Sequence, residues 1–171
     1  MRFHVLPYTL ARSFVPTERT LAIRIFDPDA DRSEDNNAKQ KLTTSPFWVA
    51  ELEYTFVDFD PLRYSGFQLS FVTDMLKEYQ DKNWLITPVV AAQIINSFAR
   101  YKDRINAVMI HCNAGMSRSP TVALFLCRHF NITPEWVGTR DYYMKNCVFD
   151  MLEGRPAPNS MVWDMLEGAK T

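Results

Sequence analysis

The residues best suited to chemistry lie together in one short stretch, residues 108–120, which reads VMIHCNAGMSRSP. An apolar run leads into Cys112, five residues separate Cys112 from Arg118, and Ser119 and Pro120 follow. A loop between a strand and a helix can turn successive backbone N–H groups inward, and the helix start adds unpaired N–H groups and a partial positive charge. The stretch therefore predicts a phosphate-binding loop with a cysteine at its first position.

Individual side chains of this stretch have distinct expected roles. The positive field favours the ionised, nucleophilic form of Cys112. Arg118 has a planar fork that binds two phosphate oxygens at once, which a lysine cannot do. Ser119 adjoins Arg118 and is expected to donate a hydrogen bond to the sulfur of Cys112. This hydrogen bond would ease the departure of the sulfur in the second step of a phosphoryl transfer. Gly115 suits a position with unusual torsions or close approach to a ligand.

This pattern resembles the signature of protein-tyrosine and dual-specificity phosphatases: histidine, cysteine, five residues, arginine and serine, after an apolar strand. The extended match, His-Cys-x-Ala-Gly-x-Ser-Arg-Ser-Pro, is most similar to the dual-specificity branch and its small bacterial and phage relatives. The resemblance implies that His111 helps to position the loop and to tune the thiolate. It also implies that the phosphate is bound by Asn113, Ala114, Gly115, Met116, Ser117 and Arg118.

The position of the loop in the chain and its composition narrow the choice among the phosphatase branches that share this signature. The loop lies past the middle of the chain, whereas low-molecular-weight phosphatases and arsenate reductases have a similar loop near the N-terminus. It contains no lysine, a residue that phosphoinositide phosphatases often use there, and Ser119 stands where the RNA-phosphatase branch usually has threonine. We therefore expect a phosphorylated protein or peptide as substrate, with phosphotyrosine preferred and phosphoserine and phosphothreonine open.

Hydrolysis of a phosphate ester by such a loop also needs a general acid, because an alkoxide or phenoxide leaves slowly unless its oxygen is protonated. Relatives take this acid from an aspartate upstream of the signature. Residues 51–58 alternate as a strand does, which places Asp58 on the face of the apolar side chains and makes it the preferred acid. Asp60 is an alternative, because a difference of one residue in the turn would exchange the roles of Asp58 and Asp60. Asp81 is another, since its distance from Cys112 is close to that in compact dual-specificity enzymes.

The elements around the loop follow from periodicity and turn residues. Strands are expected at 21–26, 51–58 and 107–110, and helices at 67–83, 87–102, 120–130, from 131 onward and after Asn159. Thr87 and Asn159 are expected N-caps, and 29–41 reads as an exposed polar loop. The alternation predicts one α/β phosphatase domain over residues 1–171, with a central, mostly parallel sheet flanked by helices. The segment 155–159, RPAPN, resembles the one before the last helix of these phosphatases.

Composition, cysteine spacing and apolar runs argue against several other classes of protein. The formal net charge of -1 shows none of the basic excess of a nucleic-acid binder. Three cysteines without C-x-x-C spacing argue against a disulfide scaffold or a zinc site and for a reducing compartment. Cys127 reads as core, and Cys147 as a conceivable disulfide partner of Cys112. No apolar run suits a signal peptide or a membrane span. We expect a cytoplasmic protein without cofactor, metal ion, nucleic-acid partner or membrane association.

Two alternative functions remain open. A phosphate- or phosphopeptide-binding module would use the same loop with little or no turnover. A sulfur-transfer or arsenate-reducing enzyme would need a dedicated resolving thiol.

Overall fold

The structure, a computed structural model, describes residues 1–28, 41–64, 69–138, 141–152 and 157–170. The expected loop at 29–41 therefore lies outside the described residues except for Lys41. The strands are β1 (Arg2–Pro7), β2 (Thr20–Phe26), β3 (Trp48–Thr55), β4 (Ala107–Cys112) and β5 (Glu135–Trp136). The helices are α1 (Tyr8–Ala11), α2 (Leu69–Asp81), α3 (Pro88–Tyr101), α4 (Arg118–His129), α5 (Asp141–Leu152) and α6 (Ser160–Gly168), with 3-10 turns η1 (Pro61–Tyr64) and η2 (Lys102–Arg104).

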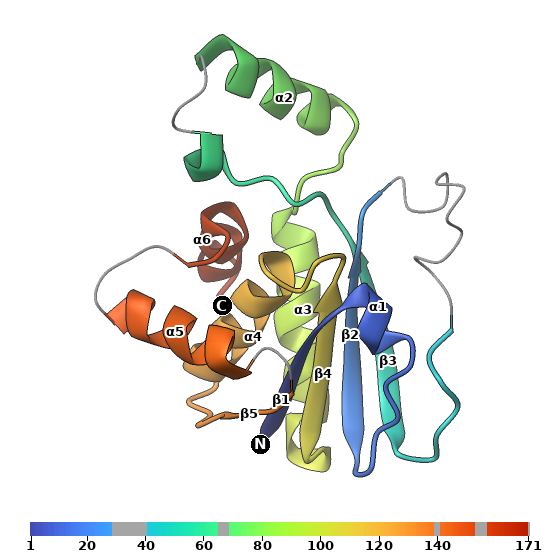
Figure 1. The fold of residues 1–171 in the computed structure, drawn as a ribbon. Coiled ribbons are helices and arrows are strands. Elements are labelled where there is room, and N and C mark those ends of the chain that lie inside the picture. The colour runs from blue at the N-terminus through green and yellow to red at the C-terminus, as the bar shows by residue number, and fades with distance from the viewer. Residues whose placement is uncertain (29–40, 65–68, 139–140, 153–156, 171) are drawn as a thin grey trace.

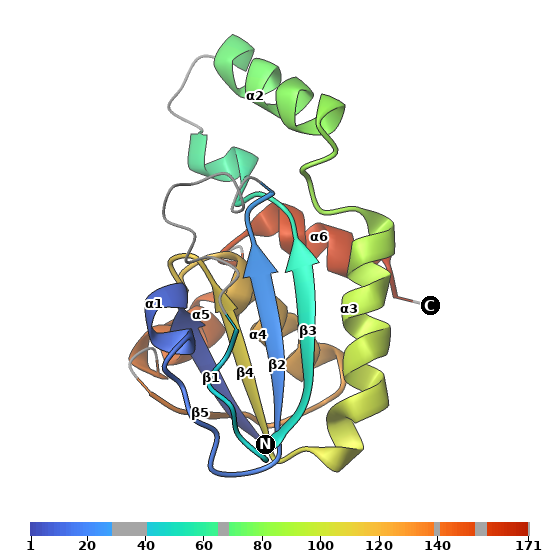
Figure 2. The same cartoon turned by 90° about the vertical axis from the view of Figure 1, so that its right-hand side faces the viewer.

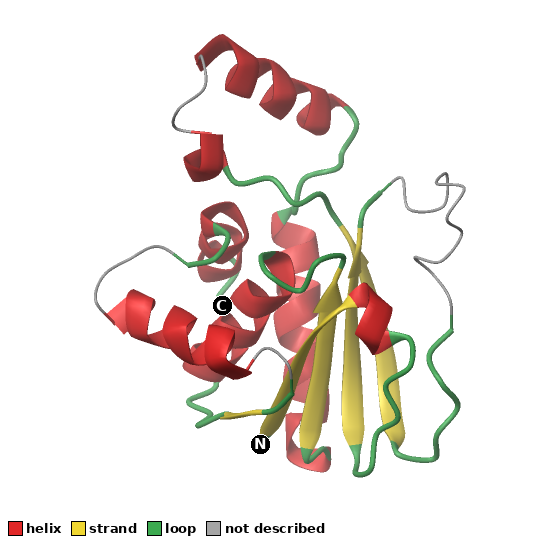
Figure 3. Cartoon of the chain, in the orientation of Figure 1, coloured by secondary structure: helices red, strands yellow, loops and turns green. Residues whose placement is uncertain are grey.

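The described strands form one five-stranded sheet in the order β3-β2-β4-β1-β5, and every pairing in it is parallel. This confirms the expected α/β class (Figure 3). Because the strands are parallel, their carboxyl ends meet at one edge of the sheet (Figure 1). β4 is central and all six of its residues are buried, which is what a continuous apolar run predicts for a strand covered on both faces.

Helices cover the two faces of the sheet unequally. One face carries Ile23, Val108 and Ile110 and packs with α3, α4 and α6 into the main hydrophobic core. The other face has a smaller cluster of Leu6, Ala11, Ala22 and Met109 beneath α1. Figure 2 shows α1 in front of the sheet and α4 behind it. β4 thus has packed side chains on both sides, and the loop that follows it starts from a fixed base.

The two expected N-caps are confirmed. The side chain of Thr87 accepts a hydrogen bond from the backbone N–H of Val90, with Pro88 at the first helical position of α3. The side chain of Asn159 does the same for the N–H of Val162 in α6. Val89 is 66% exposed, and the residues of α3 that face the core are Ala91, Ile94, Ile95 and Phe98.

Two element boundaries were wrong. The strand expected at 51–58 ends at Thr55, because the N–H of Val57 donates to the carbonyl of Trp84 and the backbone leaves β2. The helix expected from residue 131 begins only at Asp141, as α5, because 135–136 form β5 and the N–H groups of Glu135 and Val137 donate to the carbonyls of Met1 and Phe3. The pattern at Thr133 and Pro134 suggested a helix cap, but these long-range hydrogen bonds to β1, which the sequence did not predict, prevail.

α2 confirms the helix expected within 67–83. It stands away from the sheet in both ribbon views (Figures 1 and 2).

Candidate active site

Two expected site residues, Asp58 and Cys112, lie at the carboxyl edge of the sheet together with two residues that were not predicted, Tyr8 and Asp27. Tyr8 follows β1, Asp27 follows β2, Asp58 comes three residues after β3, and Cys112 ends β4. In open parallel sheets this edge is where ligands bind. The residues between Cys112 and α4 form the loop on which the prediction depends, called here the 113–117 loop.

The end of β1 supports the 113–117 loop from one side. The N–H of Tyr8 donates to the carbonyl of Asn113 over 3.0 Å. Gly115 has φ +69°, and a Cβ there would lie 2.6 Å from the backbone nitrogen of Pro7 and 2.7 Å from the carbonyl carbon of Leu6. Since these are backbone atoms, only glycine fits. Gly115 therefore lets the loop close onto a strand more than a hundred residues earlier in the chain.

α5 contacts the loop as well. The hydroxyl of Tyr143 donates to the carbonyl of Met116 over 2.6 Å. The loop thus has backbone contacts with two separate elements, which limits the conformations open to it.

Cys112 and Ser119 lie together as expected. The sulfur of Cys112 is 3.2 Å from the hydroxyl oxygen of Ser119, and the two residues are 1% and 0% exposed. Ser117, the residue before α4, makes no capping hydrogen bond with its side chain. The first N–H groups of α4 thus lack a side-chain cap from Ser117 near the sulfur.

Arg118 is oriented by a carboxylate that the sequence reasoning missed. Its two η nitrogens donate to the two carboxylate oxygens of Asp27 over 2.9 and 3.1 Å, and Nη1 also donates to the carbonyl of Phe56 over 2.6 Å. Arg118 is 2% exposed. Its Nε is buried and has no hydrogen-bond acceptor among the described residues. The fork is therefore fixed in direction, and its Nε–H is left to bind an anion.

Asp27 was not among the predicted site residues. Its signal was its place, directly after an apolar strand whose carboxyl end would meet that of 107–110 in a parallel sheet.

The three candidate acids lie in different surroundings. Asp58 is beside the 113–117 loop: its Oδ1 accepts hydrogen bonds from the hydroxyl of Ser117 and, over 3.0 Å, from the amide of Asn159. Arg63 is 3.7 Å from the same oxygen. The Asp58 side chain is 28% exposed, so part of it is open to solvent beside the loop.

Asp60 and Asp81 are placed differently. Asp60 is 4% exposed and accepts from the N–H of Leu62 and the hydroxyl of Ser160 over 3.1 and 2.7 Å, so it connects η1 to α6. Asp81 is the exposed last residue of α2. Of the three carboxylates, that of Asp58 has a hydrogen bond to the 113–117 loop.

His111 points to the face of the sheet opposite the main core. Its Nε2 accepts from Nε of Arg24 over 3.2 Å, and its ring lies against Tyr8 and Phe26. Burial, reinforced by the charge of Arg24, lowers the pKa of His111 to about 4. The imidazole is therefore neutral near pH 7, with its proton on Nδ1 because Nε2 is an acceptor.

Arg24 was not anticipated as part of this arrangement. It is 2% exposed and pairs with Glu51 and, over 2.8 Å, with Glu53 on β3.

The other two cysteines are in different environments. Burial raises the pKa of Cys127 to about 12 and also raises that of Cys147. All three cysteines are free thiols, so the disulfide considered between Cys112 and Cys147 is not formed. Neither Cys127 nor Cys147 is disposed to act as a nucleophile near neutral pH.

Comparison with known proteins adds nothing to this geometry, because no family model, curated protein or solved structure matches the chain. Within the described ranges, no three His, Cys, Asp or Glu side chains are grouped so that they could hold a metal ion. In the same part of the chain, none of the helices combines the length and apolar character that crossing a bilayer requires.

Proposed function

We propose that this chain is a cysteine-dependent phosphoprotein phosphatase that hydrolyses phosphotyrosine through a cysteinyl-phosphate intermediate. The observation that supports this most directly is the state of Arg118. Its guanidinium is buried, held by Asp27, and retains a buried Nε–H without an acceptor in the described residues. Burying such a donor is costly unless a ligand completes it. A phosphate oxygen beside the sulfur of Cys112 would do so.

In the first step the thiolate of Cys112 attacks phosphorus in line with the leaving oxygen. The S–P bond forms as the P–O bond to the tyrosine breaks. Backbone N–H groups of the 113–117 loop and the start of α4, together with Arg118, stabilise the charge on the three equatorial oxygens. Asp58 gives its proton to the phenolate, which leaves as tyrosine.

In the second step water attacks the cysteinyl-phosphate. Asp58 takes a proton from the water, the P–O bond to that oxygen forms and the S–P bond breaks, so that inorganic phosphate and the thiolate are released. The hydroxyl of Ser119, 3.2 Å from the sulfur, donates to the thiolate as it departs. The loop and Arg118 supply the positive charge, so no step calls for a metal ion.

The substrate class follows from the loop composition. A loop without lysine favours a monoester with one phosphate over a polyphosphorylated headgroup. Phosphoserine and phosphothreonine are the second class to test, because their alkoxide leaving groups depend more strongly on the acid.

Turnover of para-nitrophenyl phosphate by the wild type and by Cys112→Ser tests the proposal, with Cys147→Ser as the matched control. We expect vanadate-sensitive hydrolysis in the wild type and the control, and none in Cys112→Ser. A phosphotyrosine peptide that binds without turnover would support the binding-module alternative instead. Activity with thiosulfate or arsenate alone would support the sulfur-transfer or arsenate-reducing alternative.

A further inference from the structure

Asn159 has more contacts than its role as a helix cap requires. It is 0% exposed and lies at the start of α6, far from the 113–117 loop in sequence. Its backbone N–H donates to the hydroxyl of Thr121 over 2.9 Å, and its side chain contacts three further groups. Two of these groups, Asp58 and Ser117, belong to the candidate active site.

The orientation of the Asn159 amide is settled by its hydrogen bonds. The backbone N–H of Val162 lies 3.0 Å from one end of the amide, and a backbone N–H can only donate. That end is therefore the oxygen, and the opposite end is the nitrogen. The nitrogen carries two hydrogens and lies 3.0 Å from Oδ1 of Asp58 and 3.2 Å from the hydroxyl oxygen of Ser117.

These contacts form a closed triangle. The Asn159 amide donates to both Ser117 and Asp58, and the hydroxyl of Ser117 donates to the same Oδ1 of Asp58. Oδ1 thus accepts two hydrogen bonds and has no room for a proton of its own. A proton on this carboxyl group must then reside on Oδ2.

We propose that Asn159 is a positioning residue for the general acid: its amide holds Oδ1 of Asp58, so that the transferable proton is carried by Oδ2. This inference rests on the proposed function, and in particular on Asp58 as the acid. Asn159 acts through Asp58 and is not required to touch the substrate.

Surrounding hydrogen bonds fix the position of Asn159 relative to Asp58 and Ser117. Thr121, which accepts from the Asn159 backbone, donates with its own hydroxyl to the carbonyl of Ser117 over 2.8 Å. Arg63 donates to the carbonyl of Pro158 over 2.8 Å while lying 3.7 Å from Asp58. The start of α4, the start of α6 and the segment after β3 are thereby joined in one hydrogen-bonded unit.

The cap and the positioning role can be separated by substitution. Serine and aspartate both cap helices well. Serine is too short to donate from the place of Nδ2, and an ionised aspartate only accepts hydrogen bonds. Asn159→Ser and Asn159→Asp should therefore keep α6 while releasing Oδ1 of Asp58. Thr87→Ala is the matched control, because it removes a cap from α3 at a residue with no hydrogen bond to the site.

The experiment measures kcat and KM for two substrates. Para-nitrophenyl phosphate is the aryl phosphate, and a phosphoserine peptide is the alkyl phosphate. A displaced acid should lower kcat for the alkyl phosphate about 10- to 100-fold more than for the aryl phosphate, with KM nearly unchanged. Both Asn159 variants should show this difference, and Thr87→Ala should show none even if its melting temperature falls.

The outcomes separate this inference from the proposed function. An active wild type whose Asn159→Ser and Asn159→Asp variants lose activity equally on both substrates would overturn the positioning role and leave the phosphatase proposal intact. A wild type that hydrolyses neither substrate would overturn both. Should Asn159→Ser unfold, Asn159→Asp, which keeps the side-chain length, decides the question.

Discussion

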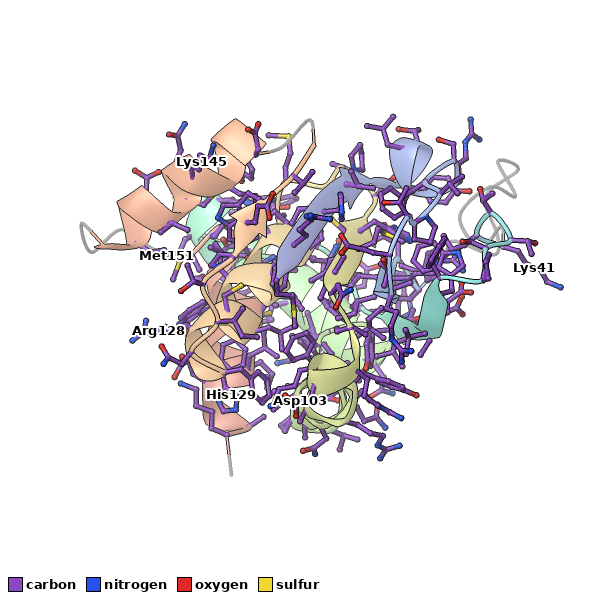
Figure 4. All side chains as sticks on the ribbon, turned by 90° about the horizontal axis from the view of Figure 1, so that it is seen from below. Lys41, Asp103, Arg128, His129, Lys145 and Met151 are labelled. Carbon is purple, nitrogen blue, oxygen red and sulfur yellow. The ribbon has the colours of Figure 1, made fainter. Side chains whose placement is uncertain are left out.

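Each end of α4 is associated with a histidine, a cysteine and an arginine, yet the two ends differ in chemistry. At the first end are His111, Cys112 and Arg118, and at the last end are Cys127, Arg128 and His129. Figure 4 shows the last end from below, with Arg128 and His129 labelled. The first end lies at the carboxyl edge of the sheet and the last end lies away from it (Figure 1).

Surroundings account for the contrast. Cys112 and Cys127 both belong to the main hydrophobic core, but the sulfur of Cys112 has a hydroxyl 3.2 Å away. Burial raises the pKa of Cys127 to about 12. Arg118 is buried against Asp27, whereas Arg128 is exposed and lies 5.6 Å above the ring of Trp163. His129 stacks on Phe125. Residue type alone therefore predicts little, and position at the sheet edge distinguishes the two sets.

The largest expected difference between the two ends is in the nucleophile. Cys112→Ser should lower kcat for para-nitrophenyl phosphate by at least about 10⁴-fold, because an alcohol at that position is a far weaker nucleophile than a thiolate. Cys127→Ala should keep kcat within about twofold. Steady-state kinetics measure both, and equal losses in the two variants would remove the contrast.

The arginines give the next largest difference. Arg118→Lys should lower kcat/KM about 10²- to 10³-fold, because an ammonium group cannot reproduce the bidentate contact with Asp27 and the bond to phosphate together. Arg128→Lys keeps the charge on an exposed stem and should change kcat/KM less than about twofold. Circular dichroism and melting temperature check that both variants are folded. Tolerance of lysine at 118 would contradict the assigned role.

The third prediction asks whether Asp58 completes the first end of α4. Asp58→Asn should lower kcat for a phosphoserine peptide about 10²-fold and kcat for para-nitrophenyl phosphate much less, since only a poor leaving group needs the proton. Asp81→Asn should leave both rates unchanged. Asp60→Asn should lower the melting temperature through its contacts with Leu62 and Ser160. A selective loss in Asp81→Asn instead would transfer the acid role to α2.

The smallest expected effect is on stability and comes from His111. Its pKa is about 4 in the folded chain and about 6.5 when unfolded, so between these values the unfolded chain binds more protons. The contribution of His111 to the free energy of unfolding is therefore complete above pH 6.5 and is lost as the pH falls towards 4. It amounts to at most about 3 kcal/mol.

Urea unfolding at pH 7 and pH 4.5 measures this effect, with His111→Gln as the comparison. The loss of stability on acidification should be smaller in the variant. It should not vanish, because burial also lowers the pKa of His4. Equal losses in wild type and variant would show that His111 does not titrate in this way.

What could be predicted from sequence was local. The stretch from His111 to Ser119, the caps at Thr87 and Asn159, and the helix expected at 120–130 all depend on residues a few positions apart, whose geometry follows from one strand, one turn or one helical turn. The α/β class followed because the periodicities alternate along the chain. The errors arose where distant chain intervened, as at β5 and at the end of β3.

The site residues that were missed are those defined by long-range contacts. Asp27 meets Arg118 across 91 positions, and the amide of Asn159 meets Asp58 across 101. Likewise Arg24 reaches His111 across 87 positions. No short window along the sequence contains both members of such a pair, so local composition does not indicate which residues are paired.

The sequence by itself determined the chemical groups of the first end of α4: a thiol, a guanidinium and a hydroxyl at the spacing of one loop and one helix start. Only the tertiary structure decided which carboxylate holds the guanidinium, which one lies beside the loop, and why residue 115 must be glycine. The physical reason is that hydrogen bonds and steric contacts depend on distance in space, and the parallel sheet brings together the ends of strands that are far apart along the chain.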